Sequence, residues 1–297
     1  MPKVILHIGT MKTGTTSIQE TLSNNADVMS RFNYTYVGPP MRTSAVLGPT
    51  IKALTDTKHD LIISDEGLWH FADSKRSDTH KLAGLLRGYD VTVLIYLRRP
   101  DSFLNSWFQQ GLKSGTGAKT MSQFLDSPFV KSGLEFSKRI KRFETLFGAG
   151  SIKLRAYEKS QLKGGDAVLD FLHVTNLPAE DFMLPQPKNK TPDTDSLLLR
   201  SLYQRDLGRS SKLLANLGKL NQHLSNNGYK GRRYNLLTKA ELQTIITTYQ
   251  PEFSRLQSEY GGGVSPSFFE SWPDIENANN SLLDLRMVQE EMLSLES

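Results

Sequence analysis

The sequence predicts an α/β fold in which helices cover both faces of a central parallel β-sheet. Three observations support this class. Four short, almost continuous apolar runs indicate strands that are buried on both faces, as parallel strands are. Sequence with helical apolar spacing separates these runs. The chain of 297 residues, 38% of them hydrophobic, is also long enough to bury a large core.

The predicted strands are rich in branched apolar residues, which favour pleated and buried positions. The first one stops at a glycine and is followed at once by helical sequence. The four strands cover Lys3 to Ile8, Leu61 to Ser64, Val91 to Leu97 and Ile152 to Tyr157.

Helices are predicted where apolar residues recur at helical spacing and where capping residues flank them. Proline favours the first position of a helix, and glycine favours the position after its end. Pro100 therefore opens a helix in DSFLNSWFQQGLK, and Gly148 ends one in LEFSKRIKRFETLFG. Two further predicted helices are Thr15 to Leu22 and the segment DAVLDFLHV.

The pattern changes after Leu184, where LPQPKNKTPDTD forms a proline-rich loop. The segments SLLLRSLYQ and KAELQTIITTYQPEFSRLQSEY follow with helical spacing, so a helical C-terminal cover is expected from about residue 190. We expect one α/β domain over residues 1–260. Three successive glycines, Gly261 to Gly263, then open a C-terminal tail over residues 261–297.

Composition narrows the function classes. The chain has no cysteine, which excludes disulfides and thiolate metal sites. No apolar run has the length of a signal peptide or approaches the roughly 18 residues of a membrane span, so we expect a cytoplasmic protein. The net charge of +5 suits an anionic ligand. The basic clusters RR, KRIKR and RRY are scattered, so a nucleic-acid-binding protein is the weaker alternative.

The stretch HIGTMKTGTTS carries the strongest functional signal. Gly9 and Gly14 have the glycine spacing of the nucleoside-triphosphatase loop G-x-x-x-x-G-K-[ST], but Thr15 stands where that loop has lysine. Lys12 lies two residues before the second glycine instead. A glycine-rich turn between a strand and a helix directs backbone N–H groups at one point, which suits a phosphate.

The segment TMKTGTTS resembles the 5'-phosphosulfate loop of sulfotransferases that use 3'-phosphoadenosine 5'-phosphosulfate (PAPS), whose usual form is PK-[ST]-G-[ST]-[ST]. The resemblance implies a P-loop fold, PAPS as co-substrate and no metal. It places Lys12 on the oxygen that bridges phosphate and sulfonate, and Met11 where the family usually has proline. The residues expected to cradle the 5'-phosphate are Thr13, Gly14, Thr15, Thr16 and Ser17.

A second anion site is predicted after the strand VTVLIYL. Arg98 and Ser106 lie eight residues apart (106 − 98) with Pro100 between them, which resembles the 3'-phosphate motif R-x-P-x-x-x-x-x-S of the same family. Arg99 either joins this site or faces solvent. Since a 3'-phosphate takes no part in bond breaking, loss of Arg98 is expected to appear largely as weaker cofactor binding.

Transfer of a sulfonate also requires a group that removes the acceptor proton. Glu66, in LIISDEGLWHF, stands where related enzymes carry a histidine base in a K-T-H element, and other branches of the family use glutamate. Asp65, His70 and His7 remain alternatives, as does an acidic turn that merely caps a helix.

The resemblance further implies a hydroxyl or amine acceptor, with a carbohydrate or another polyhydroxyl compound favoured. The basic turn from Gly228 to Tyr234 either closes over the adenosine end of PAPS or is a basic surface loop. The main rival function is a nucleoside-triphosphate-dependent kinase or hydrolase, which needs a lysine directly after Gly14 and an acidic magnesium ligand. The lysine is missing, and Asp65 could serve as the magnesium ligand.

Overall fold

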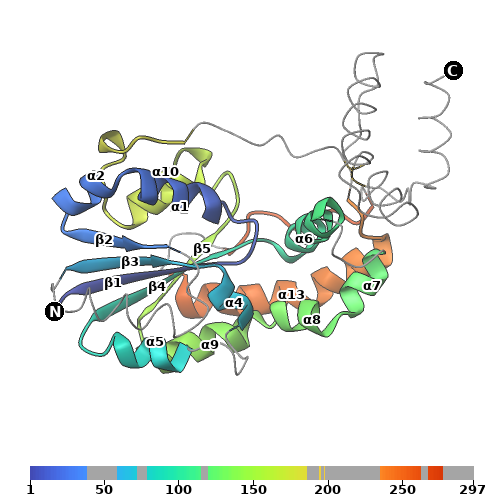
Figure 1. The fold of residues 1–297 in the computed structure, drawn as a ribbon. Helices are drawn as coiled ribbons and strands as arrows, with labels where there is room; N and C mark the ends of the chain where they lie inside the picture. Colours follow the sequence, from blue (N-terminus) through green and yellow to red (C-terminus); the bar gives the residue numbers. More distant parts are fainter. Residues whose placement is uncertain are drawn as a thin grey trace, which may run out of the picture. The chain divides into compact units, whose positions relative to one another are not determined.

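The structure is a computed structural model that describes residues 1–38, 59–71, 79–114, 120–185, 235–261 and 267–276, together with Thr194 and Leu197 (Figure 1). The chain divides into two compact units. The first combines residues 1–103, 132–188 and 249–270, and the second combines residues 104–131, 189–248 and 271–297. The single domain expected over residues 1–260 and the tail after it stay predictions.

A five-stranded, all-parallel sheet forms the centre of the first unit, with strand order β2-β3-β1-β4-β5. The predicted α/β class is confirmed, and the four predicted strands are present. The fifth, β2, was not predicted; it is short, half-exposed and lies at the sheet edge. The strands are β1 (Lys3–Gly9), β2 (Tyr34–Val37), β3 (Asp60–Ser64), β4 (Asp90–Leu97) and β5 (Ile152–Ala156).

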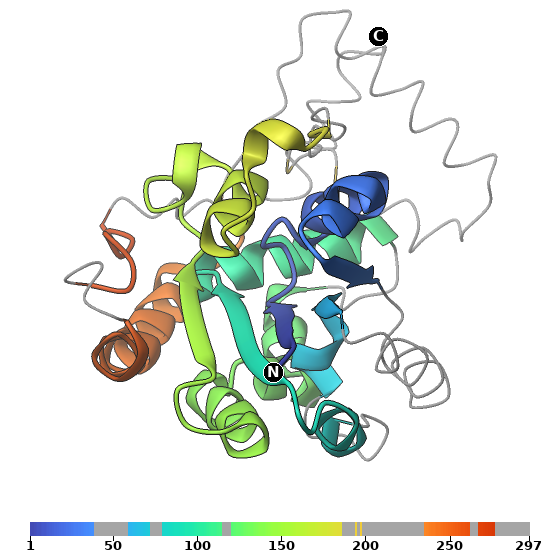
Figure 2. The same ribbon diagram turned by 90° about the vertical axis from the view of Figure 1, so that its left-hand side faces the viewer.

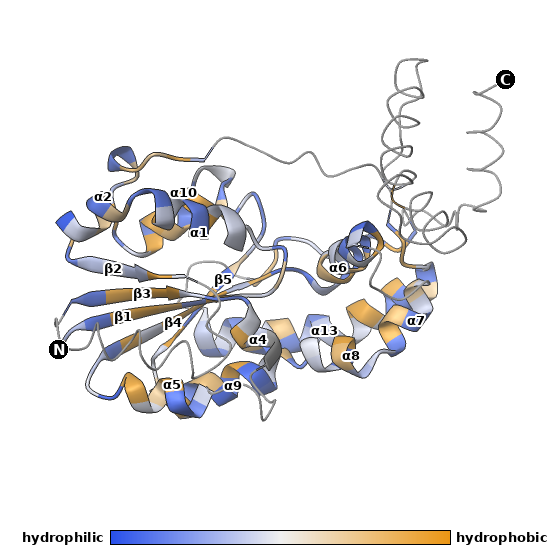
Figure 3. Ribbon diagram, viewed as in Figure 1, coloured by the Kyte–Doolittle hydropathy of each residue, from blue (hydrophilic) through white to orange (hydrophobic). Residues whose placement is uncertain are grey.

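Helices cover both faces of this sheet, as Figures 1 and 2 show. One face carries α1 (Thr15–Asn24), α2 (Ala26–Arg31) and α10 (Ala167–Val174). The other carries α4 (Gly67–Phe71), α5 (Thr79–Leu85) and α9 (Phe136–Phe147). The strands β1, β3 and β4 are apolar along most of their length, which fits strands covered on two sides (Figure 3).

The predicted helix ends agree with local capping. Asp166 caps α10 by accepting hydrogen bonds from the N–H groups of Val168 and Leu169. Gly148 follows α9 with φ 103°, a left-handed value that glycine adopts without strain. On α9, Phe136, Ile140 and Phe143 are buried at helical spacing, which is the apolar face that the sequence predicted.

A buried polar network fixes α10 against the sheet. The Tyr96 hydroxyl of β4 donates to Asp170 Oδ2 at 2.8 Å, and Arg155 Nε of β5 donates to the same oxygen at 3.0 Å. Burial and the adjacent Asp170 carboxylate raise the pKa of Tyr96, so the hydroxyl keeps its proton and acts as the donor. Because Asp170 is fully buried and paired, this network sets the position of α10.

Most of the remaining elements belong partly or wholly to the second unit, whereas the two short 3-10 helices belong to the first. The helix α6 (Pro100–Ser114) begins at the predicted proline, and α13 (Lys239–Tyr260) matches the predicted KAELQ helix and contains Pro251. The predicted SLLLRSLYQ helix lies outside the described residues, apart from Leu197. No helix in the described ranges is long and apolar enough to cross a membrane. The other elements are α7 (Met121–Asp126), α8 (Pro128–Gly133), η1 (Lys163–Gly165) and η2 (Ala179–Asp181).

Candidate active site

The predicted site residues of the first unit follow the carboxyl ends of neighbouring strands. Thr10, directly after β1, donates its N–H to the carbonyl of Tyr96 in β4 at 3.1 Å. Asp65, after β3, donates to the carbonyl of His7 at 3.2 Å, and Tyr157, after β5, donates to that of Leu97 at 2.8 Å. The sheet therefore brings the glycine-rich loop, the acidic turn and the residues after β4 and β5 to one edge, which is where ligands bind in open parallel sheets.

The loop between β1 and α1 is held in an unusual backbone conformation. Lys12 has φ 69° and Gly14 has φ 76°, both in the left-handed region. For a residue with a side chain this region costs about 1–2 kcal/mol, so neighbouring contacts must hold Lys12 there. One such contact is internal: Thr13 Oγ1 donates to the carbonyl of Thr10 at 2.6 Å.

Glycine is required at both ends of this loop for different reasons. A Cβ atom on Gly9 would lie 2.6 Å from Thr13 Oγ1 and 2.9 Å from Thr15 Oγ1. A Cβ atom on Gly14 would lie 2.7 Å from the Cβ of Ala167, at the start of α10. Gly14 therefore serves two purposes: it permits the left-handed turn, and it lets α10 approach the loop closely.

The hydroxyls of the loop divide into two groups. Thr13 and Thr15 are buried, with their Oγ1 atoms 3.4 Å apart, and so stabilise the loop itself. Lys12, Thr16 and Ser17 are exposed. They stand at the N-terminus of α1, where the N-cap residue, Gly14, has no side chain to bond the first N–H groups. This arrangement offers an anion the helix end, two hydroxyls and an amine.

Arg98 lies beside the same loop. Its Nε donates to Ser102 Oγ at 2.8 Å, and its Nη1 donates to the carbonyl oxygen of Lys12 at 3.1 Å. The guanidinium lies over the Tyr157 ring, 5.7 Å from the ring centroid. Burial lowers the pKa of Arg98, but a guanidinium still keeps its charge in proteins. A hydrogen bond from a charged group contributes about 1.5–3 kcal/mol, enough to offset the backbone strain at Lys12.

The other half of the predicted 3'-phosphate motif is less defined. Ser106 belongs to the second unit, so its pairing with Arg98 stays a prediction. Arg99 forms a two-bond ion pair with Asp101, at 2.7 Å and 3.1 Å. The predicted basic turn from Gly228 to Tyr234 lies outside the described residues.

The two acidic residues of the turn after β3 have different surroundings in the structure. Asp65 is buried, and its Oδ1 accepts a hydrogen bond from the Gly67 N–H at 2.7 Å, so it caps the start of α4. Glu66 is half-buried, at the same edge as the loop. Asp65 thus fits the capping role that the sequence left open, whereas Glu66 has the greater access to a substrate.

His7 is a core residue. Its ring is fully buried, with edge contacts to Tyr96 and Phe171, and burial lowers its pKa to about 3. Its Nδ1 lies 2.8 Å from Ser64 Oγ, to which Gln19 of α1 also donates, at 3.3 Å. A neutral, enclosed imidazole fits a structural link between β1, β3 and α1. His70 belongs to α4, but its side chain lies outside the described part.

Three neighbours of the site were not singled out from the sequence: Tyr157, Ser102 and Gln19. Ser102 lies in the first turn of α6, four residues after Arg98, so this contact is local in the sequence. Tyr157 was assigned to the end of a strand, and nothing in the sequence indicates that its ring lies under Arg98.

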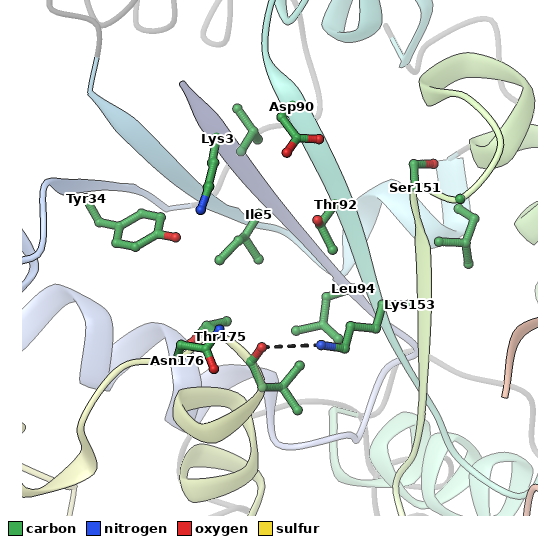
Figure 4. Close-up of a pocket in the computed structure, with 14 residues that line it drawn as sticks. Lys3, Ile5, Tyr34, Asp90, Thr92, Leu94, Ser151, Lys153, Thr175 and Asn176 are labelled. Carbon is green, nitrogen blue, oxygen red and sulfur yellow. Dashed lines mark hydrogen bonds between the residues drawn. The ribbon is translucent and has the colours of Figure 1, made fainter. Parts of the chain in front are cut away.

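A pocket of about 380 Å³ opens at the opposite end of the sheet, near the amino ends of β1, β4 and β5 (Figure 4). Its lining includes Lys3, Tyr34, Asp90, Lys153 and Asn176, and Lys153 Nζ donates to the carbonyl of Val174 at 3.4 Å. None of the predicted site residues lines it. The amines and the carboxylate give it a mixed charge, which selects no ligand class.

No protein-family model matches the chain, and no curated protein matches it. Among solved structures, the chain is similar to the crystal structure of a sulfotransferase from Alicyclobacillus acidocaldarius. The sequence identity is 16% and the TM-score is 0.40, and the similarity covers 73% of this chain and 96% of that chain. The functional assignment therefore rests on the residues of the loop and their neighbours.

Proposed function

We propose that the protein transfers the sulfonate group of PAPS to a hydroxyl or amine acceptor and releases adenosine 3',5'-bisphosphate. The observation that carries the proposal is the placement of Lys12. Its side chain is exposed at the N-terminus of α1, and its carbonyl is bonded to Arg98. Two cations thus meet at one glycine-rich loop, with the lysine before Gly14 rather than after it.

The position of the lysine suits sulfonate transfer. The acceptor oxygen or nitrogen forms a bond to sulfur while the bond from sulfur to the bridging oxygen breaks, so negative charge grows on that oxygen. PAPS has no β or γ phosphate, which are the groups that a lysine after Gly14 would reach. A lysine before Gly14 instead stabilises charge on the bridging oxygen, which is strongest in the transition state.

Other residues supply the remaining tasks. Thr16 and Ser17, together with the backbone N–H groups of Thr13, Gly14 and Thr15, are proposed to hold the 5'-phosphate. Arg98, together with Ser106, is proposed to hold the 3'-phosphate. Glu66 is proposed to take the acceptor proton, since it follows β3 at the edge of the sheet that carries the loop and is not fully buried. The acceptor is proposed to be a glycan or another polyhydroxyl compound, on the family resemblance alone.

The rival kinase or hydrolase finds less support. Thr15, which replaces the lysine of that loop, is buried with its hydroxyl turned towards Thr13. Asp65, the candidate magnesium ligand, is also buried and already accepts the Gly67 N–H. A magnesium ligand needs its carboxylate oxygens accessible to the ion and to its water shell.

The proposal is tested with PAPS labelled at sulfur and a panel of acceptors that includes oligosaccharides, phenols and amines. We expect label to move to at least one acceptor in the absence of added magnesium, and Lys12→Ala to suppress this transfer. If no acceptor is labelled while the protein hydrolyses or transfers the γ-phosphate of ATP in the presence of magnesium, the proposal is wrong.

A further inference from the structure

Arg98 contacts the backbone of the residue that carries the proposed catalytic amine. Its Nη1 donates to the carbonyl oxygen of Lys12 at 3.1 Å. Two further contacts fix the guanidinium. Its Nε donates to Ser102 Oγ at 2.8 Å, and its Cζ lies 5.7 Å from the centroid of the Tyr157 ring. The guanidinium is therefore held between the end of β4 and the glycine-rich loop.

Lys12 needs support at this carbonyl because of its own backbone conformation. With φ 69° it lies in the left-handed region, which residues with a side chain occupy only where the surroundings hold them. Gly14 shares this region without strain. Loss of the bond from Arg98 would remove one of the contacts that hold the peptide plane after Lys12, and so would loosen the backbone from which the Lys12 side chain extends.

The bond to Lys12 still leaves Arg98 able to bind an anion. A guanidinium has five N–H donors. Among the described residues, Ser102 and the Lys12 carbonyl take one donor each, so three remain for the oxygens of a phosphate. Arginine can thus hold a phosphate and the loop carbonyl at the same time, which the single ammonium of a lysine cannot do with fixed geometry.

We propose that Arg98 positions Lys12 in addition to binding phosphate, and that this coupling makes the enzyme select donors with a 3'-phosphate. The inference rests on the proposed function, because it takes the anion on Arg98 to be that phosphate. When the 3'-phosphate occupies the remaining donors, it adds to the contacts that already hold Arg98, and Arg98 then keeps Lys12 more firmly over the bridging oxygen. A donor without this phosphate binds more weakly and, once bound, also reacts more slowly.

The link between Arg98 and the loop is tested first in the ligand-free protein, by amide hydrogen exchange over residues 10–14. We expect Arg98→Ala to speed this exchange by about tenfold or more, since a charged hydrogen bond that holds the loop is lost. Arg99→Ala is the matched control, because Arg99 pairs with Asp101, and it should leave loop exchange unchanged. Ser102→Ala should act in the same direction as Arg98→Ala but more weakly, and it serves if Arg98→Ala does not fold.

Donor selection is tested by single-turnover kinetics at saturating donor. For Arg98→Ala with PAPS, and for the wild type with adenosine 5'-phosphosulfate, the chemical rate should fall by about tenfold in addition to the loss of affinity. Unchanged loop exchange, together with an unchanged rate at saturation, would show that Arg98 only binds phosphate and would overturn the inference while leaving the proposed function intact. Failure of the wild type to bind adenosine 3',5'-bisphosphate would instead overturn the proposed function and, with it, the proposed selection of donors. The hydrogen-exchange experiment would still decide whether Arg98 holds Lys12 in place.

Discussion

The Cα of Gly14 faces Ala167 so closely that a Cβ atom on Gly14 would lie 2.7 Å from the Cβ of Ala167. This approach joins the glycine-rich loop to the first residue of α10, whose own position is set by the buried Tyr96, Asp170 and Arg155 network. The loop conformation thus depends on a helix more than 150 residues away in the sequence, a separation given by 167 − 14 = 153.

Gly14→Ala should therefore destabilise the protein and disable the loop. The left-handed backbone and the collision with Ala167 together should lower the free energy of unfolding by roughly 2 kcal/mol or more. Gly84→Ala is the control, since Gly84 is exposed within α5 and a Cβ atom there meets no atom within 4 Å. That change should stabilise by up to about 1 kcal/mol. Equal urea midpoints for the two variants would contradict the account of the loop.

Lys12→Ala should separate chemistry from binding. Since the amine is proposed to stabilise charge that grows only in the transition state, kcat should fall by on the order of 10²-fold or more. The affinity for adenosine 3',5'-bisphosphate, which lacks the sulfonate, should change much less. Single-turnover kinetics at saturating PAPS provide the measurement, and a wild-type chemical rate in Lys12→Ala would rule out this role.

The two acidic residues after β3 should respond differently to substitution. Glu66→Gln should lower turnover by about 10²- to 10⁴-fold, as expected on loss of a general base. Asp65→Ala removes the acceptor for the Gly67 N–H and should lower the free energy of unfolding by about 1 kcal/mol, with a much smaller effect on turnover. Turnover and urea unfolding of both variants decide the assignment: a larger loss of turnover in Asp65→Ala would transfer the role of base to Asp65.

His7 should make stability depend on pH in the acidic range. Burial lowers its pKa to about 3, whereas histidine in an unfolded chain titrates near its ordinary value of 6.5. Between these values the unfolded state binds a proton that the folded state does not, so the free energy of unfolding falls as the pH falls from 6.5 towards 3. The slope attributable to His7 approaches about 1.4 kcal/mol per pH unit inside this window.

His7→Gln removes this titration. Unfolding by urea at several pH values between about 6 and 4 should give a shallower dependence for the variant than for the wild type. The acidic residues of the chain contribute to both curves, so the difference between the curves isolates His7. Parallel curves would show that His7 can accept a proton in the folded state, and would return it to the candidates for the general base.

The sequence predicted the central strands well because apolar runs are a direct consequence of burial on both faces. It did not predict β2, since Tyr34, Thr35 and Tyr36 are only partly buried at an edge that pairs with β3 alone. The glycine-rich loop and Arg98 were found from the spacing of residues within two short motifs. Such spacing can be read from the sequence because the residues of each motif lie close together along the chain. The bond from Arg98 to the Lys12 carbonyl could not be found that way, because it depends on how β1 and β4 pair in space.

The acidic turn shows the same limit more sharply. Asp65 and Glu66 are adjacent and chemically alike, so no pattern in the sequence decides which side chain turns inward. In the structure Asp65 turns inward because its carboxylate accepts a hydrogen bond from the Gly67 N–H at the start of α4, which has no acceptor within the helix. The position of Tyr157 could not be predicted for a similar reason. Its ring lies under Arg98 because β5 pairs with β4, and the spacing of residues in the sequence does not indicate that pairing.

Isothermal titration calorimetry of the ligand-free protein tests the central claim most directly. The titrants are adenosine 3',5'-bisphosphate without metal and ATP with magnesium, applied to the wild type and to Arg98→Ala. The account predicts that the wild type binds adenosine 3',5'-bisphosphate without metal and more tightly than ATP with magnesium, and that Arg98→Ala weakens this binding by about 10- to 100-fold, the equivalent of a charged hydrogen bond. Tight binding of ATP with magnesium, together with no binding of adenosine 3',5'-bisphosphate, would contradict it.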